Sequence, residues 1–561
     1  MNTSAPVPLI LRLPLAGYKF LVRRQHKHLY ALGSIVAFAF SIRVYKLELR
    51  DLWFDEAFSG ALILHLHDQP ARFWHILIGF LYLEGLSPLA PWLTSSTFLL
   101  RLPSALCGSL SILPLYAIAR HLLSRRWALM CCLLFALAFS QVLWSREARY
   151  YIFMEFFALL SVAALLKYRR DKASRHAGFC ALALLLSLAC NPASVLLIPP
   201  IAYFFINTPQ LSPPARRRAR LAFWGILGLG ALWPLAWMTM VQRLSSTITT
   251  IIPHSPIAHF QPGLLYDILG AFTYGGDHLG HGGSGFEIAP ENLVVPRILL
   301  VILPLLALLA FIPWRKRVVK IVSVSDKQIQ GDTGFVVLWL LLPMGEILLL
   351  SYYYPYRSLP RYILFSQPPL LILLCLGLTR LRSRLLSTGL SLAIVILFAL
   401  ALGNLYTPAK PSWKSIAAAV QETSQGKACL LFSPTDQVYP FFYYYDPAHE
   451  VYAKTYHLCR NPQYIVAPQP TRSFLYRQQL VLGLEYEVQD EDIRAALAQC
   501  PSNTPVIAIR SPIWMGLSAD QRLTALLSQN HHLTSEQSFI WDGITVSTYT
   551  PNTQAPARES R

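Results

Sequence analysis

The chain has 561 residues, of which 54% are hydrophobic and only 14% are charged, and its mean hydropathy is positive. This composition excludes an ordinary soluble domain and indicates an α-helical protein that crosses a membrane many times. The formal net charge of +19 does not indicate nucleic-acid binding, because the basic residues form short clusters between apolar segments, as in the cytoplasmic loops of membrane proteins.

The N-terminus is basic and precedes a first apolar segment over about residues 28–44. These features are typical of a signal sequence, and cleavage at the AFAF stretch is the alternative. We interpret the segment as an uncleaved anchor, because the candidate site that follows it must be held at the membrane. Residues 47–96 then form a long outer loop rich in Trp, His and Pro, whose short apolar pieces are expected to lie as helices in the membrane interface.

An acid pair, Asp55 and Glu56, lies near the start of this loop beside the aromatic residues Trp53, Phe54 and Phe58. In an apolar, partly buried setting a carboxylate can be tuned as a proton acceptor. Neighbouring side chains on a helix point about 100° apart, so only one acid of the pair can face a given reaction centre. We predict that Asp55 is the general base and that Glu56 completes the catalytic pair. The alternative is that both acids only favour the positive end of a helix dipole.

Ten further apolar segments predict membrane spans, which with the first gives about eleven transmembrane helices. Asn191-Pro192 is a turn signal that divides one long apolar run into a tight hairpin of two spans. This division places every basic cluster between spans on the cytoplasmic side, so the charge pattern decides the count. The predicted spans are 97–119, 127–144, 150–167, 177–190, 192–207, 221–241, 295–313, 335–351, 361–379 and 386–404.

A second long outer loop, residues 242–294, ends in a glycine-rich stretch that is a candidate lid over a site. Its glycine spacing matches neither a P-loop nor a dinucleotide-binding motif. Asp277, His278 and His281 are a weak candidate for a metal site. No cysteine pair has zinc-site spacing, so the sequence requires no cofactor, although a divalent metal is possible.

The apolar segments end near residue 405, and residues 405–561 begin with a helix, a glycine break and a buried strand. This order predicts an α/β domain, and an odd number of spans places it outside the cytoplasm. Cys429 lies in the apolar strand and is expected to be packed there. Cys459 and Cys500 lie in polar surroundings, which suggests a disulfide between them in an oxidising compartment.

Two further polar clusters are predicted at the same membrane face as the acid pair. In WSREARYY, residues 144–151, Arg146, Arg149 and Tyr150 have the i, i+3, i+4 spacing of one helical face. Arginine binds phosphate through a rigid fork of N–H groups, so these residues are candidates to hold a phosphate. The alternative is interfacial anchoring by Arg and Tyr side chains.

The other cluster is YYYPYRSLPRY, residues 352–362, where Arg357 and Arg361 are candidates for a second phosphate contact or for stabilising a leaving group. An aromatic belt at the membrane interface is the alternative. Glu155 and Glu346 are predicted inside spans, where an ionisable group is costly and therefore a functional suspect, although pairing with a nearby arginine would also explain them.

Several of these segments resemble a known family. LWFDEAFS, RLPSAL, SREARYY, PRYILFSQPPLLILLCLGL and SWKSIAAAV, in this order, look like the bacterial branch of the C-type glycosyltransferases, which is similar to the protein O-mannosyltransferases and the lipid A aminoarabinose transferases. The resemblance covers the membrane part, residues 1–404, and its junction to the outer domain. It implies transfer of a sugar from a polyprenyl-phosphate donor at the outer face of the cell membrane, with Asp55 by position as the essential acid.

Two departures leave the acceptor open between a lipid, a glycan and a protein. Many relatives carry His-Pro-Pro or Thr-Pro-Pro in the first outer loop, where this chain has QPARFWHIL at residues 69–77. Relatives often have a histidine at the turn where this chain has Asn191. Neither departure affects the residues of the acid pair.

The predicted reaction is a single displacement that inverts the anomeric carbon, with Asp55 as the base and arginines that stabilise the departing polyprenyl phosphate. The predicted location is the cell inner membrane, with the C-terminal domain in the periplasm and membrane lipids as further partners. A polytopic lipid or glycolipid flippase is the alternative, although we find no internal repeat of the kind common in transporters. An inactive scaffold is a third possibility.

Overall fold

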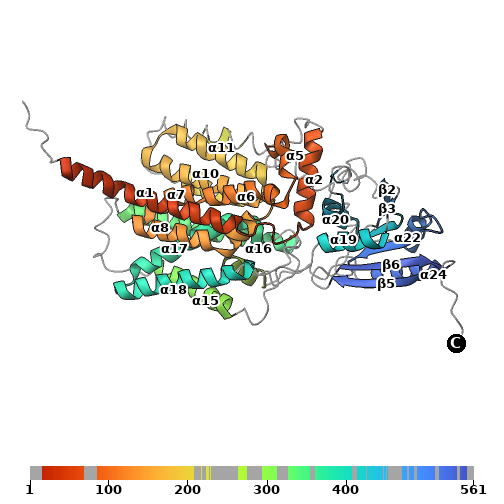
Figure 1. The fold of residues 1–561 in the computed structure, drawn as a ribbon. Helices are drawn as coiled ribbons and strands as arrows, with labels where there is room; N and C mark the ends of the chain where they lie inside the picture. The colour runs from red at the N-terminus through yellow and green to blue at the C-terminus, as the bar shows by residue number, and fades with distance from the viewer. Residues whose placement is uncertain are drawn as a thin grey trace, which may run out of the picture.

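A computed structural model of the chain describes residues 15–68, 85–206, 217, 221, 223–225, 228, 263–273, 294–311, 326–353, 360–406, 413–424, 426–446, 448–449, 452, 471–476, 479–484, 489–511, 517–539 and 544–552. Figure 1 shows a helical part and a smaller part built on a β-sheet, with α2 of the first facing α20 of the second. The two parts correspond to the membrane domain and the C-terminal α/β domain that the sequence predicts.

Within the described residues the helical part consists mainly of α-helices. Their bounds are α1 (Leu15–Val44), α2 (Phe54–Asp68), α5 (Ala90–Leu93), α6 (Thr97–Leu110), α7 (Ile112–Leu122), α8 (Arg125–Leu137), α9 (Phe139–Ser145), α10 (Tyr151–Asp171), α11 (Ser174–Cys190), α12 (Ile198–Ile206), α14 (Gly263–Thr273), α15 (Val294–Leu308), α16 (Asp326–Tyr353), α17 (Gln367–Arg380) and α18 (Arg384–Gly403). The 3-10 helices are η1 (Ser87–Leu89), η2 (Pro192–Leu197), η4 (Leu309–Phe311), η6 (Pro360–Ser366) and η7 (Asn404–Tyr406).

Five helical stretches among the described residues are long and apolar enough to cross a membrane. α8 and α9, bent by 57° at a short break, make a sixth if they form one span, and α11 and the segment Pro192–Phe205 are shorter apolar helices. The five stretches are Thr97–Leu122, Tyr151–Asp171, Asp332–Leu349, Pro360–Arg380 and Arg384–Gly403. All these segments overlap predicted spans, but the predicted count of about eleven is not confirmed.

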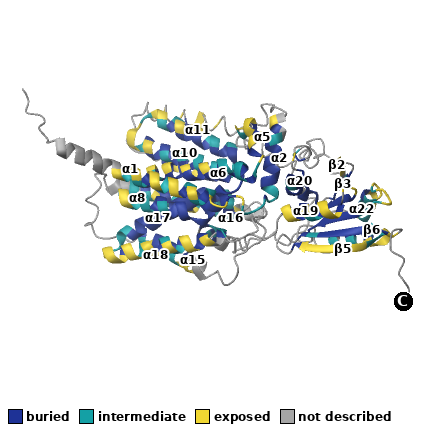
Figure 2. Cartoon of the chain, viewed as in Figure 1, coloured by how far each residue is buried: buried dark blue, intermediate teal, exposed yellow. Residues whose placement is uncertain are grey.

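The outer surface of the helical part carries large apolar side chains. In Figure 2 exposed residues lie on the outward faces of α15 and α18, while α17 is almost entirely buried. Leu385 and Leu392 of α18 and Leu349 of α16 are among the most exposed apolar residues. An aqueous surface rarely exposes so many large apolar side chains together, whereas a lipid-facing surface requires them.

The chain breaks at Asn191, as the Asn191-Pro192 turn signal predicted. The Asn191 side-chain oxygen accepts a hydrogen bond from the Ala193 amide at 2.7 Å and thereby begins η2. This bond satisfies an amide that has no partner inside the new helix. Whether the two segments cross the membrane as separate spans stays a prediction.

The C-terminal part is a six-stranded mixed sheet in the order β2-β3-β1-β4-β6-β5. β1 pairs in parallel with β3 and β4, and the other pairs are antiparallel. The strands are β1 (Cys429–Ser433), β2 (Thr471–Tyr476), β3 (Gln479–Leu484), β4 (Val506–Arg510), β5 (His531–Phe539) and β6 (Ile544–Pro551), and the helices are α19 (Trp413–Ser424), α20 (Val438–Tyr445), α22 (Asp490–Leu497) and α24 (Leu517–Asn530). The predicted helix, glycine break and buried strand correspond to α19, Gly426 and β1.

The disulfide prediction was wrong in its pairing. Cys429 and Cys500 form the disulfide, 71 residues apart in the chain. The apolar strand predicts a packed thiol for Cys429, but Cys500 follows α22, which packs against the face of β1 where Cys429 points. Cys459, the partner predicted for Cys500, lies outside the described residues.

Candidate active site

The helix α2 begins at Phe54 and carries both acids of the predicted pair in its first turn. Residues four apart share a helical face, so α2 presents three different surfaces around Asp55. Asp55 and Ser59 lie on one, Glu56 on the next, and Phe54 and Phe58, whose rings stack with centroids 6.2 Å apart, on a third. Each surface contacts a different part of the chain.

Asp55 pairs with Arg149, which lies 94 residues away in the sequence. The Arg149 Nη2 and Asp55 Oδ2 atoms are 3.2 Å apart, with side chains 9% and 19% exposed. Nη1 also donates to the main-chain oxygen of Asp55 at 3.0 Å and to Ser59 Oγ at 3.1 Å. One guanidinium therefore holds the carboxylate, the backbone and the adjacent hydroxyl of the same face of α2. Burial opposes the charge of Arg149, but the negative charge of Asp55 raises the pKa of Arg149.

Glu56 points away from this face and is completely buried. Its two oxygens accept hydrogen bonds from Arg101 of α6 at 2.6 and 2.8 Å. The other three N–H groups of Arg101 donate to the carbonyls of Leu47, Arg50 and Asp51. All five donors of this arginine are satisfied, and they join α6, α2 and the segment before α2 into one unit. The structure therefore gives Glu56 a supporting position rather than an open one.

The predicted helical face of Arg146, Arg149 and Tyr150 does not exist. α9 ends at Ser145 and α10 begins at Tyr151, so residues 146–150 form an irregular turn. The i, i+3, i+4 spacing was misleading because the helix is interrupted at that point. The side chains consequently point to different places.

Arg146 binds the end of α1. Its guanidinium donates to the carbonyls of Arg43 and Lys46, at 2.9 and 2.7 Å, and also to that of Tyr45, and it stacks on the ring of Tyr406. Carbonyls at a helix C-terminus lack partners within the helix and attract a cation, which explains this position. The phosphate role predicted for Arg146 stays untested, and the present contacts engage it elsewhere.

Arg361, at the start of η6, lies in the same cluster as Arg149. Its guanidinium carbon is 5.5 Å from the ring centroid of Tyr151, and that of Arg149 is 5.7 Å from the same ring. The charges of Asp55 and Arg361 interact. Tyr150 joins the cluster, since its hydroxyl accepts a hydrogen bond from Arg149 at 3.3 Å. The structure thus brings together four of the predicted site residues from three distant segments.

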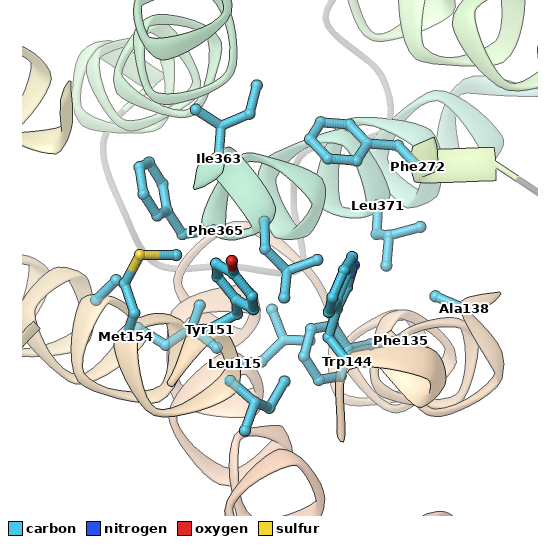
Figure 3. Packing of buried hydrophobic residues seen from close by; sticks show 14 of the residues in the cluster. Leu115, Phe135, Ala138, Trp144, Tyr151, Met154, Phe272, Ile363, Phe365 and Leu371 are labelled. Atoms are coloured by element: carbon cyan, nitrogen blue, oxygen red, sulfur yellow. The ribbon is translucent and has the colours of Figure 1, made fainter. Parts of the chain in front are cut away.

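Tyr151 and Trp144, the aromatic residues next to this cluster, are part of the main hydrophobic core. Figure 3 shows Tyr151 and Trp144 close to each other, with Phe365 on the Tyr151 side and Leu371 on the Trp144 side. The rings of Tyr151 and Trp144 meet edge to face at 5.0 Å. Packing of this kind holds the residues around Arg149 and Arg361 in place.

Glu147 is a residue that the prediction of the site omitted, although it lies within the quoted segment SREARYY. It is 6% exposed, and its Oε2 atom has no hydrogen-bond partner among the described residues. Burial, and then the negative charge of Glu56, raise the pKa of Glu147 to about 8, against the opposing effect of Arg101 and Arg361. An acid between two arginines in that segment was the available sequence signal.

The other predicted residues have different outcomes. Arg357, the glycine-rich stretch with Asp277, His278 and His281, and residues 69–77 lie outside the described residues. Within the described ranges no group of three or more His, Cys, Asp or Glu residues could hold a metal ion. Two pockets lie near the C-terminal end of α1, one lined by Val44, residues 46–49 and Phe98 and the other by residues from Phe38 to Tyr45 with Gly403 and Tyr406, and neither is lined by Asp55.

The two acids predicted inside spans also differ. Glu155 is completely buried, accepts a hydrogen bond from Gln141 at 2.8 Å and interacts with the charge of Arg43. Glu155 forms no salt bridge with an arginine among the described residues, and its Oε2 atom has no hydrogen-bond partner there, so the structure does not show the pairing that was the alternative. For Glu346 the structure shows a buried Oε2 atom without a hydrogen-bond partner in the described part of the chain.

Comparison with known proteins places this architecture in a class. Residues 86–237 match the family model of the dolichyl-phosphate-mannose-protein mannosyltransferases. No curated protein matches the chain by sequence. This match agrees with the resemblance given by the sequence motifs, and the chain shares the fold of the two structures described next.

Two solved structures share this fold at low sequence identity. ArnT from Cupriavidus metallidurans bound to undecaprenyl phosphate is 14% identical, with 97% of this chain and 100% of that chain covered and a TM-score of 0.51. The oligosaccharyltransferase AglB from Archaeoglobus fulgidus, in complex with an inhibitory peptide and a dolichol-phosphate, is 11% identical, with 95% of this chain and 75% of that chain covered and a TM-score of 0.51. Against two other structures of the Archaeoglobus enzyme the chain covers 63% and 64% of their length.

Proposed function

We propose that this chain is a membrane glycosyltransferase that moves a sugar from a polyprenyl-phosphate donor to an acceptor hydroxyl at the outer face of the cell inner membrane. The observation that supports this most directly is the Asp55–Arg149 pair, a partly exposed carboxylate held against a guanidinium. The fold shared with ArnT, whose structure contains undecaprenyl phosphate, and with AglB, whose structure contains dolichol-phosphate, supports the same donor class.

In the proposed reaction Asp55 takes the proton of the acceptor hydroxyl, and the acceptor oxygen forms a bond to the anomeric carbon. The bond between that carbon and the phosphate oxygen breaks, and its electron pair leaves with polyprenyl phosphate, which gains a negative charge. Attack opposite the leaving group inverts the anomeric carbon. The orientation of Asp55 is set by Arg149, which binds its main chain and its side chain at once.

The developing charge on the phosphate requires cations nearby, because in a low-dielectric setting an uncompensated second charge costs several kcal/mol. Arg149 and Arg361 flank the ring of Tyr151 and are the proposed source of this charge, with the hydroxyl of Tyr150 as a further hydrogen-bonding group. Arg357 keeps its proposed role as a second phosphate contact.

The proposed outer location of the C-terminal domain agrees with its chemistry. A disulfide such as Cys429–Cys500 forms and persists in oxidising compartments, which include the periplasm and exclude an ordinary cytosol. An odd number of spans would place the domain on that side. The acceptor remains a lipid, a glycan or a protein, and each of these classes has to be tested.

The test is incubation of the purified protein in lipid with labelled polyprenyl-phosphate sugars and a mixture of lipid, glycan and peptide acceptors. We expect label to move from the donor to one acceptor class, with release of polyprenyl phosphate and inverted stereochemistry. Movement of the labelled lipid across vesicles without transfer to any acceptor would instead identify a flippase and overturn the proposal.

A further inference from the structure

α2 is held between the membrane part and the C-terminal domain. The face with Asp55 meets Arg149, while Phe54 and Phe58 meet Tyr439 of α20, with ring centroids 5.8 and 5.4 Å from that of Tyr439. Figure 1 shows α2 at the edge of the helical part next to α20. The C-terminal domain therefore contacts the surface of α2 that lies beside its Asp55 surface.

Helix α20, with the sequence VYPFFYYY, faces two cores at once. Phe441, Phe442 and Tyr445 pack in the core of the sheet domain. Tyr439 and Tyr443, four residues apart and thus on one helical face, pack with the core of the membrane part instead. Because both faces are buried, α20 couples the position of the sheet to the position of α2.

Hydrogen bonds from the C-terminal domain also reach the backbone on both sides of Asp55. The Leu52 amide donates to the hydroxyl of Tyr444 at 2.8 Å, and the hydroxyl of Tyr452 donates to the carbonyl of Ala57. Gly60 permits this approach, since a Cβ atom there would lie 2.6 Å from the Tyr452 oxygen.

A charged contact completes the junction. Asp51, just before α2, accepts a hydrogen bond from the Lys414 amide at 2.8 Å, in the first turn of α19, and its carboxylate lies 3.7 Å from the Lys414 ammonium. An acid at a helix N-terminus satisfies an amide that lacks an internal partner and interacts favourably with the helix dipole. Asp51 thus connects the first helix of one domain to the segment that leads into α2.

The contacts of the C-terminal domain oppose a rotation of α2 that would change which acid of the pair faces Arg149. A rotation of α2 by about 100°, the angle between neighbouring residues, would bring Glu56 to the position of Asp55 relative to Arg149. A helix of this length is marginal by itself, so its orientation depends on packing at its sides. The contacts of Tyr439, Tyr444 and Tyr452 oppose that rotation.

We propose that the C-terminal domain positions the active site. Tyr444 and Tyr452 fix the rotation of α2 about its axis and its position along that axis, so that Asp55 rather than Glu56 meets Arg149. This inference rests on the proposed function for its effect on catalysis, but the positioning itself can be measured without activity. The two tyrosines are positioning residues, because Tyr452 contacts α2 and Tyr444 contacts the segment just before it, and neither bonds to the proposed reaction centre.

The test compares the wild type with a protein carrying both Tyr444→Phe and Tyr452→Phe, which retains the rings and loses the two hydroxyls. The matched control is Tyr445→Phe on the same helix, whose hydroxyl donates within the C-terminal domain to Gln479. The measurements are amide hydrogen exchange of peptides covering residues 52–62, donor binding, and kcat with donor KM.

We expect exchange over α2 to accelerate by about tenfold in the double variant, because two hydrogen bonds that hold its backbone are lost. kcat is expected to fall by a similar factor while donor KM and donor binding stay near the wild-type values, and Tyr445→Phe is expected to change none of these. Unchanged exchange over residues 52–62 in the double variant would overturn the inference. Absence of transfer by the wild type would overturn the proposed function only, since the exchange comparison still tests the positioning.

Discussion

Asp55 and Glu56 are neighbours in the chain, but their environments differ, so mutation of Asp55 is expected to affect activity and mutation of Glu56 to affect stability. Asp55 is partly exposed and faces Arg149, whereas Glu56 is buried in a two-oxygen contact with Arg101. A partly exposed ion pair contributes little to stability, while removal of one member of a buried pair leaves an uncompensated charge. The pair therefore divides into a group available for chemistry and a group that supports the structure.

Asp55→Asn is expected to abolish transfer and to change the free energy of unfolding by less than about 1 kcal/mol. Glu56→Gln is expected to lower the free energy of unfolding by about 3 kcal/mol or more, because Arg101 remains buried without its charge partner. Transfer assays and thermal unfolding of both variants in the same lipid check this contrast. Normal transfer by Asp55→Asn would remove Asp55 from the role of base.

Glu147 gives the protein a pH dependence. Its pKa is raised to about 8, above the value of about 4.3 expected for an unfolded glutamate. The folded protein therefore binds a proton that the unfolded chain lacks between these two values. This stabilisation is complete below the unfolded pKa and is lost as the pH rises through about 8.

We expect the melting temperature of the wild type to fall relative to that of Glu147→Gln as the pH rises from about 5 to about 9. Donor affinity of the wild type is expected to decrease above pH 8, because ionisation of Glu147 reduces the positive charge of the cluster. Thermal unfolding and donor-binding titrations across this range check both effects. The control is Glu422→Gln, an exposed position on α19; a pH profile identical in wild type and Glu147→Gln would contradict the prediction.

At the scale of elements, the turn between α9 and α10 contacts both α1 and α2. Arg146 binds the C-terminus of α1, the Ala148 amide donates to Glu56 at 2.7 Å, and Arg149 binds α2. The turn is short and buried, so each side chain has one accessible direction. Two arginines three residues apart consequently do different things.

Arg149→Lys is expected to weaken donor binding by about tenfold or more, since lysine retains the charge but cannot make the four N–H contacts of a guanidinium. Arg146→Lys is expected to leave donor affinity unchanged and to lower stability by about 1–3 kcal/mol through lost contacts at the end of α1. Donor titration and thermal unfolding of the two variants distinguish these roles. Unchanged donor affinity in Arg149→Lys would count against the phosphate assignment.

At the scale of the whole molecule, a hydrophobic membrane part is joined to a disulfide-linked sheet domain through α2 and α20. The exposed leucines of α16 and α18 require lipid around the first part. The disulfide closes a loop of 71 residues around much of the second. The two domains thus depend on different environments, one apolar and one oxidising.

The Cys429–Cys500 bond is expected to stabilise the C-terminal domain by about 4 kcal/mol, the chain-entropy value for a loop of this length. Peptide mapping without reductant should find Cys429 linked to Cys500, and the double substitution Cys429→Ala with Cys500→Ala should unfold at lower denaturant concentration. Cys459→Ala serves as the control and should leave the link intact. A peptide linking Cys459 to Cys500 would contradict the structure.

Much of the element scale was predictable because the signals are local. The apolar segments, the break at Asn191 and the helix-to-strand order after residue 405 depend on hydropathy and turn residues within short windows. The failures were at positions where a local rule met a tertiary exception. The spacing of Arg146 and Arg149 suggested a helix, but the helix is interrupted at Arg146. Polarity suggested Cys459 as the disulfide partner of Cys500, whereas packing makes Cys429 the partner.

The sequence by itself determined the membrane class, the α/β nature of the C-terminal domain, the resemblance to the C-type glycosyltransferases and the choice of Asp55 as the candidate base, since composition, periodicity and motifs reside in the chain. Only the tertiary structure decided which arginine meets Asp55, that Glu56 is buried against Arg101, that Glu147 belongs to the cluster, and that the tyrosines of α20 hold α2. These depend on side-chain direction and burial, which arise when segments nearly 400 residues apart pack together, as Leu52 and Tyr444 do.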